Sequence, residues 1–356
     1  MSKNVSGEYM NEASPHMPAS IEEVLPIGLQ DLEQLRLVLR GNSALDWRRL
    51  SLRSSGEALQ LLKLAGIDLR YESDRAHLRS IYGQALDYLD SQLSHFVSNG
   101  VRQLERPEEL LMLASKPGIL RDEACIILKV MHVIHHVAGR ELLHRLPVST
   151  QDLFYKIEQR VFNVIDGMRA SGIRITQFEG SRKTHSSIVT KLLCRSDSLA
   201  TEVHDRIRFR IITEDLPSLF EALNYMTRHL FPFNYVVPGE SRNDLLDLEA
   251  SIKEDEYLTH LAMGLQSLSD RDGASNPHSA KGFRMINFVV DLPVRIDDEL
   301  WMGRAFDERL GNTVFLLVEF QLIDQETHTH NNTGDNRHAL YKERQLKKVL
   351  DRLTMD

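Results

Sequence analysis

The chain has 356 residues, of which 42% are hydrophobic and 26% charged, and a formal net charge of −8 at pH 7. This composition is typical of a soluble globular protein, and the length is sufficient for two domains. A chain this acidic is not expected to coat nucleic acid, because surfaces of that kind are basic. Any polyanion that binds is therefore small, or is held at one local site.

The cysteines and the N-terminal segment indicate further classes of protein to which the chain is not expected to belong. Cys125 and Cys194 lie far apart in segments with a helical pattern, which argues against a disulfide framework and against a zinc site. The sequence has no window of about 18 apolar residues, so it does not predict a membrane span. Residues 1–20 lack the apolar core of a secretory signal, so we interpret them as a disordered tail and expect a cytoplasmic protein.

The first half of the chain, residues 21–147, predicts an all-helical domain. Leucines crowd two segments that end at Gly41 and Gly66, and apolar residues then recur at helical spacing. Proline followed by two glutamates at 107–109 is typical of a helix start. The predicted helices occupy residues 29–39, 59–64, 72–97, a segment that begins at 107, and 120–145.

Histidines in the last of these helices raise two alternatives. His132 and His136 are four residues apart on one face, as zinc ligands can be, but no third ligand and no catalytic glutamate accompany them. We therefore favour histidines that are partly buried or on the surface. A phosphohydrolase of the His-Asp type would need further His and Asp residues at helical spacing, and the only His-Asp dipeptide is His204-Asp205, at the edge of a predicted strand.

After Pro147 the pattern changes to strands that alternate with helices. We assign residues 148–356 to a domain with one mixed sheet flanked by helices, so that the whole chain is α+β. Residues 239–280 are acidic and then rich in Ser, Asp, Asn and Gly, which indicates a long insertion. The predicted strands are 173–178, 206–213, 233–237, 283–290 and 313–323, and the predicted helices are 150–170, 184–194, 216–229 and 336–352.

Residues 173–213 form a basic stretch, with eight basic and four acidic residues in an acidic protein. A polar turn, Gly-Ser-Arg-Lys at 180–183, leads into a helix on which Ser187 and Lys191 share one face. Cations and free N–H groups at a helix start are typical of a phosphate site. The alternative is a solvated basic turn.

The strand that ends this stretch carries Asp205, Arg206, Arg208 and Arg210. Alternation along a strand places the three arginines on one face, where they would repel one another unless they meet solvent or an anion. Asp205 at the start of the strand could hold Mg²⁺ between phosphates, since Mg²⁺ favours one or two carboxylates together with substrate oxygens. Its alternative role is that of a turn residue.

A third cluster lies in the apolar run 314–324, where Glu319 and Gln321 share one strand face. A carboxylate in so apolar a strand is unfavourable unless it is paired, binds a metal or takes part in chemistry. An ion pair with one of the strand arginines is the alternative to a catalytic role.

Taken in chain order, these clusters resemble motifs of the RelA/SpoT synthetase domain. That family transfers a pyrophosphate from ATP to the ribose 3′-hydroxyl of GDP or GTP and makes the alarmones of the stringent response. The family motifs Gly-Arg-x-Lys-x-x-x-Ser-Ile-x-x-Lys and Asp-x-x-Gly-Ile-Arg-Val are similar to residues 180–191 and 205–211. The matching residues are Gly180, Lys183, Ser187, Ile188, Lys191, Asp205, Arg210 and Ile211; Arg182 adjoins the position of the family's arginine, and Arg208 replaces a glycine.

Three later motifs extend the resemblance over residues 150–350. Gly-Tyr-x-x-x-His is similar to 282–287, with Phe283 for the tyrosine and Asn287 for the histidine. Val-Glu-x-Gln-x-Arg-Thr is similar to 318–324, where Ile323 and Asp324 replace the last two residues. A closing His-x-x-Tyr-Lys pattern matches His338, Tyr341 and Lys342.

The resemblance implies a nucleotidyltransferase-like fold and a Mg²⁺-dependent pyrophosphokinase. In that reading Asp205 and Glu319 are catalytic and hold the metal, and Phe283 stacks on the acceptor base. The substrates would be ATP and a guanine nucleotide, or another hydroxyl acceptor such as the 3′ end of tRNA. The nucleotide-binding residues would be Arg182, Lys183, Ser187, Lys191, Arg210, Phe283, Asn287, Gln321 and His338.

Two other functions are compatible with the same residues. The domain could bind a nucleotide or alarmone without turning it over, because Arg208, Asn287 and Ile323 depart from the motifs. Alternatively, the helical half could be a protein-interaction module that the second half regulates.

Overall fold

A computed structural model describes the chain at residues 29–40, 47–95, 97–147, 149–194, 207–245, 283–296, 306–333, 346–351 and 353–354. The predicted tail, most of the predicted insertion and the first part of the predicted helix 336–352 lie outside these residues. None of the described helices is both long and apolar enough to cross a membrane.

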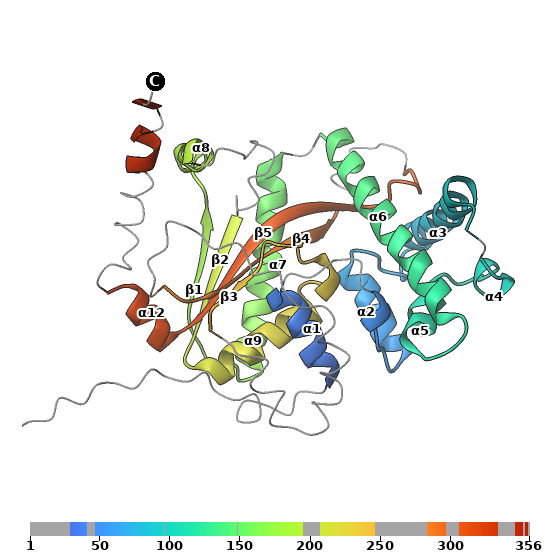
Figure 1. Cartoon of the computed structure of the whole chain (residues 1–356), viewed down its shortest axis with the longest axis horizontal. Coiled ribbons are helices and arrows are strands. Elements are labelled where there is room, and N and C mark those ends of the chain that lie inside the picture. The colour runs from blue at the N-terminus through green and yellow to red at the C-terminus, as the bar shows by residue number, and fades with distance from the viewer. Residues whose placement is uncertain are drawn as a thin grey trace, which may run out of the picture.

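One mixed sheet organises the second half of the chain (Figure 1). Strands β2 and β5 are parallel, and the other neighbouring pairs are antiparallel. Helices and a mixed sheet together give the α+β class that the sequence predicts. The strands are β1 (Ile175–Arg182), β2 (Ile207–Thr213), β3 (Arg242–Asn243), β4 (Ile286–Arg295) and β5 (Thr313–Asp324), in the order β1-β2-β5-β4-β3.

One face of this sheet is apolar and carries a row of aromatic rings. Phe209, Phe320 and Phe288 face one another in register across β2, β5 and β4, with neighbouring ring centroids 5.8 and 5.7 Å apart. All three are fully buried, and each contributes about 1.5–3 kcal/mol through burial of its ring. Helices α7 (Thr150–Ala170) and α9 (Leu216–His229) cover this face.

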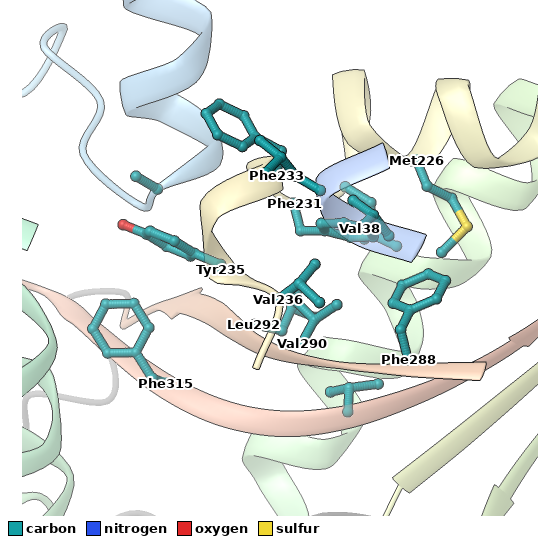
Figure 2. Close-up of a cluster of buried hydrophobic side chains, with 14 of the residues drawn as sticks. Val38, Met226, Phe231, Phe233, Tyr235, Val236, Phe288, Val290, Leu292 and Phe315 are labelled. Atoms are coloured by element: carbon teal, nitrogen blue, oxygen red, sulfur yellow. The ribbon is translucent and has the colours of Figure 1, made fainter. Parts of the chain in front are cut away.

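Helix α1 (Leu29–Arg40) also packs on the sheet half. Figure 2 shows Val38 of α1 among Met226, Phe231 and Phe288, and the hydroxyl of Ser241 donates to the Val38 carbonyl at 2.8 Å. The sequence places α1 in the helical domain, whereas its buried leucine and valine side chains belong to a core that runs through both halves. The predicted domain boundary at 147/148 stays a prediction.

The remaining described helices of the first half comprise the predicted segments and two short helices, at residues 99–102 and 47–49, that the sequence did not predict. They are α2 (Ser55–Leu64), α3 (Glu72–Leu93), α4 (Asn99–Arg102), α5 (Glu109–Ser115) and α6 (Arg121–Arg145), with a short 3₁₀ helix η2 at Trp47–Arg49. Helix α6 packs against β5 on the sheet face opposite the aromatic row, where the His136 ring stacks on Phe315 at 4.2 Å between centroids.

Several predicted elements differ from the structure. The predicted turn at 180–183 is mostly strand, because β1 stays paired with β2 as far as Arg182. The predicted strand 233–237 is instead a 3₁₀ helix, η4 (Phe233–Tyr235); Pro232 before it has no N–H to donate to a strand ladder, and Val236 alone bridges to β4.

The predicted insertion and the end of β5 also differ from expectation. Strand β3 lies inside the predicted insertion and extends the sheet. A helix that the sequence did not predict, α12 (Gln325–Asn331), follows β5, because the Asp324 side chain caps it by accepting from the Thr327 N–H at 2.9 Å.

Three histidines of α6, His132, His135 and His136, pack into the core between the two halves. Nε2 of His135 donates to the Ala65 carbonyl at 3.0 Å, and the Asn234 amide donates to Nδ1 of His132 at 3.2 Å. Burial lowers the pKa of His132, His135 and His136 below the usual 6.5. In the part of the chain that the structure describes, no group of three or more His, Cys, Asp or Glu residues could hold a metal ion.

Gly139 controls how closely α6 approaches β5. A Cβ at this position would lie 2.5 Å from ring atoms of Phe315 and 2.7 Å from the Thr313 carbonyl oxygen. We expect Gly139→Ala to lower the free energy of unfolding by about 1–3 kcal/mol, measured by urea denaturation. Gly83→Ala in α3 is the control: no atom lies within 4 Å of its Cβ, so it should stabilise by about 0.5–1 kcal/mol. Equal effects of the two substitutions would contradict this packing.

The buried histidines predict a loss of stability in acid. Their pKa values are lower in the folded than in the unfolded state, so below pH 6.5 the unfolded state binds more protons and the free energy of unfolding falls. Each histidine contributes at most about 1.4 kcal/mol per pH unit. Urea titrations between about pH 7.5 and 5.5 measure the slope. His132→Gln should reduce it, whereas His144→Gln, at an exposed position of the same helix, should leave it unchanged.

Candidate functional site

The sheet face opposite the aromatic row carries polar side chains in register. Glu179, Arg210, Gln321, Asn287 and Arg242 come from β1, β2, β5, β4 and β3, and each faces the next across neighbouring strands. Alternation along each strand places them together, because their sequence neighbours point to the aromatic side. We call this set the polar row.

A second line of residues, one step along the sheet, joins the polar row through hydrogen bonds. Arg208 faces Glu319 in register, and its Nε donates to Oε2 of Glu319 at 3.0 Å. The Gln321 amide donates to Oε1 of Glu319 at 2.9 Å. Both oxygens of this carboxylate therefore accept hydrogen bonds, and the ion pair that the sequence offered as an alternative is confirmed.

Arg210 completes this network from the other side. Its Nε and Nη2 both donate to Oε1 of Gln321, at 3.1 and 2.9 Å. Burial and the neighbouring Arg208 lower the pKa of Arg210, while Glu179 and Glu319 act in the opposite direction. A half-buried guanidinium that is hydrogen-bonded to a neutral amide, with a second arginine beside it, is suited to bind an anion.

Helix α12 brings a further titratable group to this end of the sheet. Partial burial and the positive charge of Arg210 lower the pKa of His328. Its Nε2 is 3.0 Å from the Asn332 amide nitrogen. Sequence reasoning missed His328, because it did not predict helix α12.

The predicted phosphate turn lies at the edge of the same sheet, where β1 leads into α8 (His185–Cys194) (Figure 1). The Thr184 hydroxyl oxygen accepts from the Ser187 N–H at 3.3 Å and lies 2.9 Å from the Ser187 hydroxyl. Thr184 therefore caps the helix, and Lys183 lies directly before this cap. Lys191 belongs to α8.

Arg182 is not brought to the polar row. It faces Ile207 in register, on the aromatic side of the sheet. There its Nε and Nη2 donate to the two carboxylate oxygens of Glu158 in α7, at 2.8 and 2.7 Å, and its guanidinium lies over the Phe154 ring. Because β1 continues through 182, alternation turns this side chain away from the predicted phosphate site.

The predicted acceptor residues lie at the β4–β3 edge. Arg242 faces Asn287 in register, and its Nη2 donates to the Phe283 carbonyl at 3.2 Å. The Oδ1 atom of Asn287 is buried and accepts no hydrogen bond. Arg242 was not foreseen, because it falls in the segment that the sequence assigned to an insertion.

Two predicted residues, Asp205 and His338, lie outside the described residues. Of the two carboxylates predicted to hold Mg²⁺, the structure therefore describes Glu319. Within the described part of the chain, that side chain is hydrogen-bonded to Arg208 and Gln321.

No family profile and no curated protein matches the chain. Among solved structures, the chain is similar to the small alarmone synthetase 1 from Bacillus subtilis, at 13% identity and a TM-score of 0.30, over 57% of this chain and 88% of that one. It is also similar to that synthetase bound to its product pppGpp, at 14% identity and a TM-score of 0.29, over 62% and 88% of the two chains. A GTP pyrophosphokinase family protein from Streptococcus pneumoniae matches at 14% identity and a TM-score of 0.27, over 58% and 89%.

The pairing of Arg208 with Glu319 predicts an asymmetric cost of substitution. Glu319→Ala removes the carboxylate that pairs with the partly buried Arg208 guanidinium, and we expect a loss of about 2–3 kcal/mol in the free energy of unfolding. Arg208→Ala/Glu319→Ala should recover part of this loss, because the guanidinium is removed together with the carboxylate. The control is Glu214→Ala, which removes the exposed partner of Arg174 and should cost less than about 1 kcal/mol. A purely additive double variant would contradict the coupling.

Proposed function

We propose that the chain binds a nucleoside triphosphate on the polar row and transfers pyrophosphate from ATP to a hydroxyl of a second nucleotide. The observation that carries the proposal is Arg210, a half-buried cation that donates through Nε and Nη2 to the neutral Gln321 oxygen. Burying a cation is unfavourable unless an anion accompanies it, and a phosphate group supplies that charge.

The donor phosphates would lie between β2 and the start of α8. Arg210 and Arg208 offer guanidinium groups on the sheet, and Lys183 stands where β1 meets the capped helix. In phosphoryl transfer most of the catalysis comes from positioning and from neutralisation of the phosphate charge. Ser187, Lys191 and His338 remain proposed nucleotide contacts on the strength of the motif resemblance.

The acceptor nucleotide would lie toward β4 and β3. The Phe283 ring would offer a surface on which a base can stack, and the motif resemblance implies a guanine base there. A guanine nucleotide is therefore the preferred acceptor, and the 3′ end of tRNA is the alternative substrate.

The magnesium ion that the resemblance implies would lower the charge of the phosphates. Asp205 remains its proposed ligand from the motif. Glu319 does not fit that role, because the Arg208 guanidinium bound at its Oε2 repels a second cation. No step of the reaction is therefore assigned to Glu319 through a metal.

Nucleotide binding without transfer is the second candidate function. The Arg208–Glu319 ion pair favours it, because accepting a proton from a substrate hydroxyl would break the pairing of this carboxylate. A site whose predicted catalytic carboxylate, Glu319, is held in this way can bind phosphates and leave them intact.

Substitution of two arginines tests the binding site. Arg210→Ala should weaken ATP binding about tenfold or more, measured by calorimetry, because it removes a charge-assisted contact to phosphate. Arg182→Ala should stay within about threefold of the unsubstituted protein, since its guanidinium binds Glu158 on the other face. Loss of binding in Arg182→Ala alone would place the phosphates elsewhere.

An acceptor screen separates the two functions. The protein is mixed with labelled ATP, Mg²⁺ and GDP, GTP or tRNA, and the products are identified by mass spectrometry. Transfer predicts AMP together with an acceptor that has gained a pyrophosphate, and loss of both products in Arg210→Ala. ATP binding without AMP formation for any acceptor would support the second candidate.

A further inference from the structure

The surroundings of Glu319 are those of an anchored anion. Its side chain is 8% exposed, and its two oxygens accept from Arg208 and Gln321 at 3.0 and 2.9 Å. A divalent ion bound there would lie beside the Arg208 guanidinium, whose positive charge repels it. The Arg208 side chain is 26% exposed, so a ligand that approaches from solvent meets the guanidinium before the carboxylate.

The same carboxylate orients both arginines of the polar face. Oε2 holds Arg208 directly, and Oε1 fixes the Gln321 amide so that its oxygen points to Arg210. The direction of each hydrogen bond follows from the chemistry, since a guanidinium can only donate and an ionised carboxylate can only accept. One buried anion thus sets the positions of two cations.

We propose that Glu319 is a positioning residue that holds a phosphate clamp of two arginines, Arg208 and Arg210. Arg208 is then a further phosphate-binding residue, and it lies where the motif resemblance implies a metal ion at this carboxylate. Glu319 itself is not a metal ligand. The phosphate part of this proposal rests on the nucleotide binding proposed above, and the metal part does not.

The sign of the effect of Glu319→Gln separates the possible roles. Loss of a negative charge near an anion site, taken alone, strengthens binding of ATP. Loss of a metal ligand weakens binding only when metal is present. Loss of an anchor weakens binding with or without metal, because both guanidinium groups lose their fixed positions.

The test measures ATP affinity by calorimetry in Mg²⁺ and in EDTA. We expect Glu319→Gln to weaken binding about tenfold in both conditions, and Arg208→Ala to do the same. The matched control is Glu179→Gln, which removes an exposed carboxylate from the same face and should tighten binding by up to about threefold. A loss confined to Mg²⁺, or tighter binding by Glu319→Gln in EDTA, would overturn the proposal.

Two further measurements keep the outcome decisive. Gln321→Leu serves as the second variant in case Glu319→Gln fails to fold. It breaks the link from Glu319 to Arg210 without a change of charge, so it should also weaken ATP binding in EDTA. Unchanged binding would refute the positioning role of Glu319. Titration with Mn²⁺ alone, followed by electron paramagnetic resonance, tests the metal part. Glu319→Gln should keep the Mn²⁺ affinity within about threefold, and a larger loss would make Glu319 a ligand. Absence of any ATP binding would refute the proposed function and leave the Mn²⁺ result valid.

Discussion

The parallel pairing of β2 with β5 determines which side chains lie on each face of the sheet. In that register Arg208 faces Glu319 and Arg210 faces Gln321, while Phe209 faces Phe320 on the other side. One pairing therefore produces both an apolar face, which the helices cover, and a polar face, which carries the candidate site. A shift by one residue would bring arginines into the aromatic layer and phenylalanines out of it, at a cost of many kcal/mol.

Different helices pack against the two faces of the sheet. Helices α7, α9 and α1 complete the aromatic side, and α6 reaches the polar side through Phe315. The position of α1 shows that the halves are interleaved, since a segment from the N-terminal half fills the core beside β4 (Figure 2). Helices from both halves of the chain therefore pack on the sheet that carries the candidate site.

The sequence was sufficient for the α+β class, for the long periodic elements and for the shared strand faces of Arg208 with Arg210 and of Glu319 with Gln321, because strict alternation is visible in a single strand. It was insufficient where pairing between strands decides the outcome. Gly-Ser-Arg-Lys is a plausible turn by composition, yet its pairing with β2 turns Arg182 to the far face. The role of Arg208 also depends on a partner more than a hundred residues away, so the family pattern showed only a missing glycine.

The length of β5 has a mechanical consequence. At one end the Thr313 hydroxyl donates to the Gly66 carbonyl of the helical half, and Glu319 lies six residues farther along the same strand, about 20 Å away. Strand β5 therefore joins the helical half directly to the carboxylate that binds Arg208, and its pairing with β4 from Thr313 to Leu322 keeps these two points at a fixed distance.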